Sequence, residues 1–164
     1  MKDLTCEPKP KNGSAKKFVL IFVALAVALY LVALAVPYYR GLFHLAALLL
    51  LVPAIFIAFK YLLTSYVYTL FSDEGRTPPC LLVEQRQGKR SSLVCRVLLE
   101  SVVSLSPYTG GPYPGRCYVY TATMRGGSYQ LLHAREDGRD IYLLLEADEG
   151  FLEALSCAAT ALEK

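Results

Sequence analysis

Two apolar runs lie next to each other in the first third of the chain. Neither Phe18–Tyr39 nor Gly41–Phe59 contains an aspartate, glutamate, lysine or arginine. About 20 apolar residues in a helix, rising about 1.5 Å each, cross the hydrocarbon core of a bilayer. Only a short loop around Arg40 separates the two runs. The sequence therefore predicts a transmembrane helical hairpin with spans at about 18–37 and 41–60.

The distribution of positive charge predicts how this hairpin is oriented. Residues 1–17 hold five lysines and two acids, and Lys60 ends the second run, whereas the loop between the runs has Arg40 alone. Positively charged flanks stay on the cytoplasmic side of a membrane. We therefore expect a multi-pass integral protein of the cell (inner or plasma) membrane with both termini in the cytoplasm.

A cleaved signal peptide is the alternative interpretation of the first run. The residues Ala33-Leu34-Ala35 would suit a cleavage site. However, the apolar region of a signal peptide spans only about 7 to 15 residues, and here a second apolar run follows at once. These features favour the hairpin.

The chain divides by composition into three parts. Residues 1–15 are polar and contain prolines, so we expect a flexible basic tail. Residues 16–64 form the hairpin, and 65–164 form one domain. From residue 64 onward there are ten basic and twelve acidic groups, which argues against a nucleic-acid partner. The lysines before the first span, Lys16 and Lys17 among them, are expected to be drawn to anionic headgroups.

Small residues recur at helical spacing inside both spans. Ala24 and Ala28 are four residues apart in the first span, as are Ala54 and Ala58 in the second. Small residues let transmembrane helices approach closely, so these four are candidates for helix packing, including packing between copies in a homo-oligomer. The competing explanation is that alanine is simply common in such helices. Pro53 is expected to kink the second span.

Past Lys60 the pattern changes to alternating β-branched and aromatic residues, which predicts strands. The expected strands are Ser65–Phe71, Cys80–Arg86, Ser91–Leu98, Ser101–Leu105, Cys117–Met124, Tyr129–Glu136 and Arg139–Glu146. An amphipathic helix over 148–163 follows, with Asp148 as its N-cap and Leu155 on its apolar stripe.

Two turns determine which residues lie opposite each other. If Gln87-Gly88 is the loop, Cys80 faces Cys95, and if Gly88-Lys89 is the loop, that pairing is lost. The pair Asp137-Gly138 is a strong hairpin signal and would place His133 opposite Tyr142. The five cysteines are scattered and odd in number, so we expect thiols in a reducing compartment.

The strands followed by one helix resemble the bacterial pleckstrin-homology-like (PH-like) domains that follow transmembrane hairpins in small membrane proteins. The aromatic strand directly after the second span and the segment Arg96–Leu105 carry this resemblance, although the proline often expected in that segment is absent. It implies an α+β membrane protein whose hairpin precedes a small antiparallel β-barrel or sandwich of about seven strands, capped by a helix. An OB-like or other small barrel is the structural alternative.

No catalytic, cofactor-binding or metal-binding pattern stands out. His133 is the only histidine of the domain, and His44, within the second span, is expected to reach water near the outer interface. Arg86, Lys89 and Arg90 surround one turn and are candidates for contact with anionic headgroups, although basic residues at a hairpin tip commonly serve solubility.

These features favour a non-enzymatic interaction or scaffold module, anchored in the lipid bilayer and binding a membrane or cytoplasmic protein. The alternative is an accessory subunit or small enzyme of lipid or envelope metabolism, whose site is completed by a partner.

Overall fold

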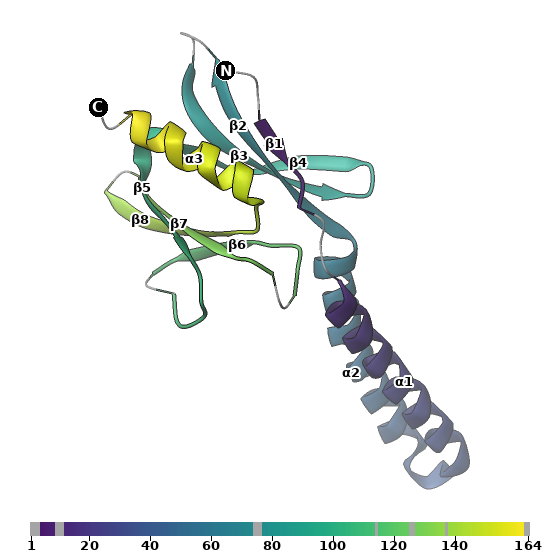
Figure 1. The fold of residues 1–164 in the computed structure, drawn as a ribbon. Coiled ribbons are helices and arrows are strands. Elements are labelled where there is room, and N and C mark those ends of the chain that lie inside the picture. The colour runs from purple at the N-terminus through teal and green to yellow at the C-terminus, as the bar shows by residue number, and fades with distance from the viewer. Residues whose placement is uncertain are drawn as a thin grey trace.

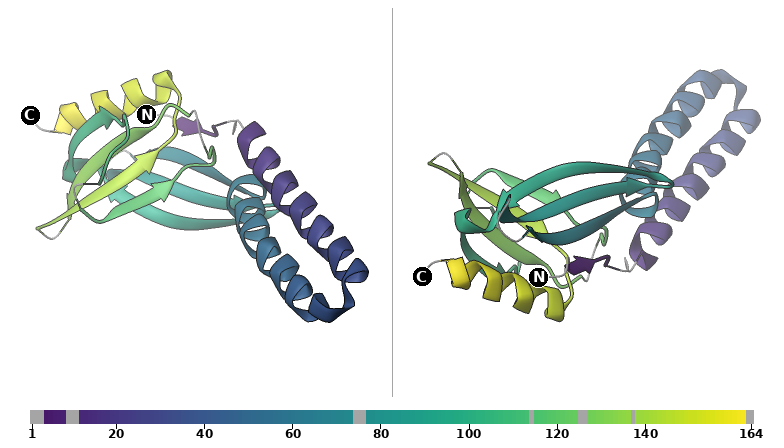
Figure 2. Two further views of the ribbon diagram at one scale, coloured as in Figure 1. Left: turned by 90° about the horizontal axis from the view of Figure 1, so that it is seen from below. Right: turned by 90° about the horizontal axis from the view of Figure 1, so that it is seen from above.

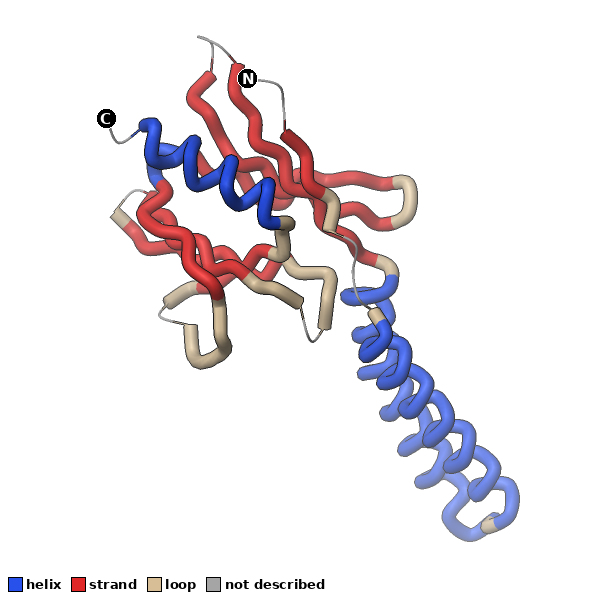
Figure 3. The backbone as a smooth tube through the Cα atoms, in the orientation of Figure 1, coloured by secondary structure: helices blue, strands red, loops and turns tan. Residues whose placement is uncertain are grey.

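The chain forms a two-helix hairpin joined to a β-rich domain (Figure 1). The computed structural model describes residues 4–8, 12–73, 77–113, 115–124, 127–136 and 138–162. Helices make up the hairpin and the C-terminal end, and nearly all strands lie between them in sequence (Figure 3). The α+β class and the order of the parts agree with the prediction.

The hairpin consists of α1 (Gly13–Ala35) and α2 (Arg40–Ile57). A 3-10 turn, η1 (Pro37–Tyr39), connects them, and a π-helical turn, η2 (Ala58–Leu62), extends α2. Pro53 lies inside α2. Both helices are long and apolar enough to cross a membrane, as the two apolar runs predicted.

The interface between α1 and α2 consists of alanines. The buried residues are Ala15, Ala26 and Ala33 on α1 and Ala47 and Ala54 on α2. Ala26 and Ala33 are two turns apart, as are Ala47 and Ala54, so each pair lies on one line along its helix.

Ala24 and Ala28 are exposed, and they do not pack against α2 as expected. Of the four predicted alanines, only Ala54 is buried, and Ala58 is half-buried. The spacing of four residues selected the wrong line on α1, where the buried alanines Ala26 and Ala33 are seven residues apart. Packing of Ala24 and Ala28 against another chain stays a prediction.

The first sheet, sheet A, is antiparallel with the order β1-β2-β3-β4. Its strands are β1 (Leu4–Cys6), β2 (Thr64–Asp73), β3 (Thr77–Gln87) and β4 (Arg90–Leu98). The strand β1 corrects the expectation of a flexible tail over residues 1–15, of which 1–3 and 9–11 lie outside the described residues. Its three residues pair with β2, from Leu4 opposite Leu70 to Cys6 opposite Tyr68.

The turn between β3 and β4 follows the second of the two predicted registers. It consists of Gly88 and Lys89, and Gly88 has a φ of 59°, a left-handed conformation that glycine adopts without strain. Cys80 consequently lies opposite Leu98 and not opposite Cys95. All five cysteines are free.

The second sheet, sheet B, has the order β5-β7-β8-β6. Its strands are β5 (Val102–Pro107), β6 (Cys117–Tyr120), β7 (Gln130–Glu136) and β8 (Arg139–Leu145), and a 3-10 turn, η3 (Leu99–Ser101), leads into it from sheet A. β6 pairs with β8 in parallel, and it ends at Tyr120, before the expected end at Met124. The described strands form two separate sheets and no closed barrel, which corrects the barrel expectation.

The core lies between the two sheets and under α3 (Glu149–Leu162), which runs along their open side (Figure 2). The Asp148 carboxylate accepts a hydrogen bond of 2.8 Å from the backbone N–H of Phe151, so the predicted N-cap is confirmed. Phe151 and Leu155 are buried in the core, as the apolar stripe predicted, whereas residue 163 lies outside the described part of the chain.

One tyrosine of sheet A forms hydrogen bonds with the last residue of β6 and with the residue that follows β8. The Tyr68 hydroxyl donates to the backbone oxygen of Tyr120 at 2.5 Å and accepts from the backbone N–H of Glu146 at 3.1 Å. Burial raises the pKa of this phenol far above its ordinary value, so it stays protonated and can donate. The two sheets are therefore held together by a buried polar link as well as by apolar packing.

Candidate functional site

The junction between the hairpin and sheet A contains almost no linker. η2 ends at Leu62 and β2 begins at Thr64. The Thr64 hydroxyl donates to the backbone oxygen of Phe59 at 2.8 Å, and the Gln87 amide donates to that hydroxyl at 3.3 Å. The last turn of the hairpin is thus hydrogen-bonded to the first rung of sheet A, which holds the domain close to the end of the helices.

The predicted basic residues do not gather in one cluster. Lys16 and Lys17 are exposed at the start of α1, and Lys89 and Arg90 are exposed at the β3–β4 turn. Arg86 is held by Glu7, with 3.2 Å between Nη1 and Oε2. The structure therefore separates Arg86, which is already paired, from its predicted companions. Contact of the others with headgroups stays a prediction.

A row of polar side chains crosses the outer face of sheet B. The strand register places Ser104 beside His133, His133 beside Tyr142, and Tyr142 beside Cys117. The predicted pairing of His133 with Tyr142 is confirmed, and their rings stack with centroids 4.7 Å apart. Asp137 of the predicted turn lies outside the described residues.

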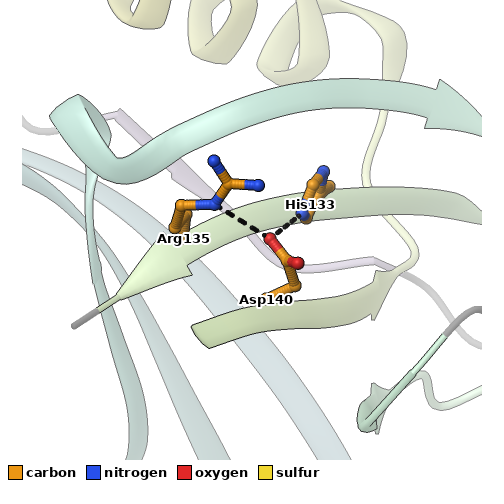
Figure 4. Close-up of polar contacts among 3 residues, drawn as sticks. All are labelled: His133, Arg135 and Asp140. Carbon is orange, nitrogen blue, oxygen red and sulfur yellow. Dashed lines mark hydrogen bonds and ion pairs between the residues drawn. The ribbon is translucent and has the colours of Figure 1, made fainter. Parts of the chain in front are cut away.

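The Asp140 carboxylate forms two hydrogen bonds on this face (Figure 4). Its Oδ1 lies 2.9 Å from Nε2 of His133 and 3.1 Å from Nε of Arg135. The hydrogen bond with His133, followed by that with Arg135, lowers the pKa of the Asp140 carboxyl, which is therefore ionised at neutral pH. Sequence analysis treated Asp140 as a solvated turn acid and missed these contacts. Arg135 lies directly opposite Asp140 in the register, whereas His133 is a diagonal neighbour, and the pairing predicted from the turn does not by itself give diagonal contacts.

This arrangement orients an imidazole but does not activate a nucleophile. No hydrogen bond joins His133 to Ser104 among the described residues. Burial raises the pKa of the Cys117 thiol, which opposes formation of the reactive thiolate. The described part of the outer face therefore presents an oriented imidazole beside a thiol that burial keeps protonated.

A buried carboxylate, also missed by the sequence analysis, holds the segment that follows β6. Glu146 accepts a hydrogen bond from the backbone N–H of Thr123 at 3.0 Å and another from the Thr123 hydroxyl. The Tyr129 hydroxyl donates to the backbone oxygen of Thr123 at 2.9 Å. These contacts explain why β6 stops at Tyr120, since the following residues satisfy their polar groups through side chains instead of a ladder.

A cavity of about 410 Å³ lies along the hairpin, between α1 and α2. His44 lines it and stacks on Tyr30 with ring centroids 5.2 Å apart. His44 is half-buried, and its Nε2 atom is buried without a hydrogen-bond partner among the described residues, so this nitrogen does not reach water as expected. The remaining lining is apolar, formed by Ala26, Val27, Ala47, Leu48 and Leu51.

Among the described residues, no group of three or more histidine, cysteine or acidic side chains could hold a metal ion. No protein-family model matches this chain, and no curated protein or solved structure matches it either.

Proposed function

We propose that this chain is a non-enzymatic, membrane-anchored interaction module whose β-rich domain is held at the cytoplasmic face of the membrane. The observation that supports membrane insertion is the inverted packing of the hairpin. Its buried residues are alanines, whereas large side chains such as Leu25, Leu48 and Phe56 are at least half exposed. A helix pair surrounded by water would bury the large side chains instead.

The connections of sheet A support the placement of both termini on one side. β1 precedes the hairpin and β2 follows it, and the two strands pair with each other. A hairpin that crosses the membrane twice permits this pairing, because it returns the chain to its starting side. The exposed lysines at the start of α1, with Lys60 at the end of the hairpin, favour the cytoplasmic side for this end.

The proposed fold relationship is to the bacterial PH-like domains. It is supported by the β-rich domain that begins directly after the second helix and ends in a capping helix. The parallel pairing of β6 with β8 departs from an all-antiparallel plan, and it would have to be a variation within this chain.

The second candidate function is an accessory subunit or small enzyme of lipid or envelope metabolism. The contact between His133 and Asp140 is the observation in its favour, since such a pair can orient a general base. A partner would have to supply the groups that the described face lacks. Replacement of His133 by asparagine separates the candidates: the interaction module keeps its function, whereas the enzyme loses it without unfolding.

The topology can be tested by thiol labelling of the full chain in membrane vesicles. Cys157 is exposed on α3, and Tyr39 is exposed at the tip of the hairpin. A membrane-impermeant maleimide should label Cys157 only in inside-out vesicles, and a cysteine at position 39 only in right-side-out vesicles. Labelling of Cys157 from the outside would contradict the proposal, as would release of the protein by alkaline carbonate.

The role of the rigid junction can be tested by lengthening it. A long Gly/Ser segment inserted between Leu63 and Thr64 should impair the cellular function while both sheets stay folded. The matched control inserts the same segment between Thr109 and Gly110, in an exposed loop of sheet B. A junction insertion that leaves function intact would show that the domain does not need to be held at the membrane.

A further inference from the structure

The inner face of sheet A extends beyond the core, and its side chains there are polar instead of apolar. On β3, Leu81 and Val83 point into the core, and the alternation of side chains brings Gln85 and Gln87 to the same face. Their partners on β4 are Ser92 and Arg90. The last two rungs of the inner face thus carry amide, hydroxyl and guanidinium groups where apolar packing has ended.

These polar rungs lie beside the end of the hairpin. The three views place the β3–β4 turn beyond sheet B, next to the end of α2 that adjoins the domain (Figures 1 and 2). The hydrogen bond from Gln87 to Thr64 fixes this placement. The uncovered inner face therefore borders the region where headgroups surround an inserted hairpin.

Two adjoining cavities occupy this corner. One, of about 250 Å³, is lined by Phe56, Phe59, Lys60, Thr64, Tyr66, Gln85 and Gln87. The other, of about 440 Å³, is lined by Gln85, Gln87, Arg90, Ser91 and Ser92. Gln85 and Gln87 line both cavities, so the two adjoin, and we call them together the groove; its lining extends from the hairpin to the end of sheet A.

The groove has an apolar end and a polar end. Phe56 and Phe59 are 65% and 57% exposed, and they lie on the last turns of the hairpin. The opposite end presents side chains that donate and accept hydrogen bonds. This order matches a membrane lipid, whose acyl chains lie in the bilayer and whose headgroup lies above it.

The charge of the groove is positive. Lys60 and Arg90 line it, and neither forms an ion pair with a residue that the structure describes. No acidic side chain belongs to the described lining. One lining residue, Ser91, does contact a carboxylate, because its hydroxyl donates a hydrogen bond of 2.8 Å to Glu84.

We propose that this groove binds one anionic phospholipid of the surrounding leaflet. Its acyl chains lie against Phe56 and Phe59, its phosphate is attracted by Lys60 and Arg90, and headgroup hydroxyls bond to the side chains of Gln85, Gln87 and Ser92. This inference depends on the proposed membrane insertion, and it adds to that proposal the class of ligand.

The test is native mass spectrometry of the full chain released from nanodiscs. The nanodiscs contain equal amounts of phosphatidylglycerol and phosphatidylcholine with the same acyl chains. The protein should retain one phosphatidylglycerol in preference to phosphatidylcholine. Arg90→Gln should reduce this preference about fivefold, the effect of one cation near a membrane surface. Gln87→Leu should reduce retention without changing the charge.

Two matched controls separate the groove from general surface charge. Lys89→Gln removes a charge from the same turn but outside the groove lining, and Arg139→Gln removes one from the start of β8. Neither should change the lipid preference. Equal retention of both lipids by the unaltered protein would overturn the inference, and so would an equal loss in Lys89→Gln and Arg90→Gln.

A soluble headgroup distinguishes a lipid site from a phosphate site. Glycerol 3-phosphate at millimolar concentration should not displace the lipid, because it lacks the acyl chains that contact Phe56 and Phe59. Displacement would overturn the lipid assignment. Carbonate extraction of the same membranes tests insertion separately: a protein that inserts but shows no lipid preference contradicts only this inference, whereas an extracted protein contradicts the proposed function.

Discussion

The hairpin and the sheet domain place the same kinds of side chain in opposite positions. In the hairpin, alanines are buried and leucines are exposed, whereas in the domain large residues such as Tyr68, Leu81 and Leu143 are fully buried. Only the domain follows the pattern expected in water. Under the proposed membrane insertion, one chain is folded for two solvents, since exposed leucines cost little in a bilayer and much in water.

The boundary between the two patterns is short. Phe59 is 57% exposed, whereas Thr64 is buried and begins a strand whose next inward residues belong to the core. Hydrogen bonds of Thr64 span this boundary on both sides. A substitution should therefore have opposite consequences on the two sides, and this contrast is open to direct tests.

The largest expected effect is the loss of stability when a buried side chain of the β-rich domain is truncated. Leu155→Ala removes a residue that is 1% exposed, which should cost about 2 to 5 kcal/mol of unfolding free energy. A typical domain has only about 5 to 15 kcal/mol in total. Denaturant unfolding of the full chain in detergent, followed by circular dichroism, measures this loss. Glu153→Ala, on the exposed side of the same helix, should change it by less than about 0.5 kcal/mol.

The next largest effect is expected when arginine replaces a leucine of the hairpin. The comparison is the same substitution at a leucine of similar exposure in the domain. Leu25 on α1 is 50% exposed and Leu93 on β4 is 57% exposed. Leu25→Arg should cost about 2.5 to 3.5 kcal/mol of membrane insertion, because it places a charge near the centre of a span. Leu93→Arg should leave both insertion and folding intact.

Carbonate extraction and protease protection measure this difference between the two leucine variants. Tolerance of arginine at both positions would show that the hairpin faces water, and the comparison between the regions would then fail.

A smaller effect is expected at the link between the sheets. Tyr68→Phe removes one hydroxyl and leaves the buried N–H of Glu146 and the oxygen of Tyr120 without this partner. The loss should be about 1 to 3 kcal/mol, and thermal unfolding measures it. Tyr142→Phe is the matched control, because no described residue hydrogen-bonds to its hydroxyl. An equal shift in both variants would mean that loss of any phenol oxygen has this effect.

The smallest effect concerns Asp140 on the outer face of sheet B. Its pKa is lowered in the folded protein, so its carboxylate stabilises the fold above its ordinary value of about 3.9, and this contribution is lost as the pH falls through the lower folded value. Asp140→Asn should therefore melt slightly below the unaltered protein at pH 7, and the difference should shrink as the pH falls below about 3.9 and vanish once the pH is below the folded pKa.

The comparison for Asp140→Asn is Glu153→Gln, which forms no ion pair within the described residues. The difference in melting temperature between Glu153→Gln and the unaltered protein should not depend on pH. A difference that persisted for Asp140→Asn in acid would exclude the charge as its cause.

The sequence was most informative where structure depends on neighbours along the chain. The two long apolar helices, the cap at Asp148 and the pairing of His133 with Tyr142 were predicted from local patterns, and the structure agrees. These elements need only composition, helical spacing or a short turn, so the sequence contains what determines them.

The parts that the sequence did not reveal depend on distant partners. β1 has three residues, too few for a periodic pattern, and it is ordered by pairing with β2. The parallel contact of β6 with β8 and the link through Tyr68 likewise join residues that are far apart in sequence. The groove beside Gln85 and Gln87 exists only because sheet A is longer than the core that covers it.

The pairing of β1 with β2 has a consequence for how the protein is made. Leu4 leaves the ribosome early, but its partner Leu70 is synthesised only after both spans. Sheet A therefore cannot be completed before the hairpin has been made. If the hairpin inserts as proposed, it returns the chain to its starting side, shortens the effective loop that β1 must close and so lowers the entropy cost of docking. Membrane insertion would thus act as a folding step for the domain outside the bilayer.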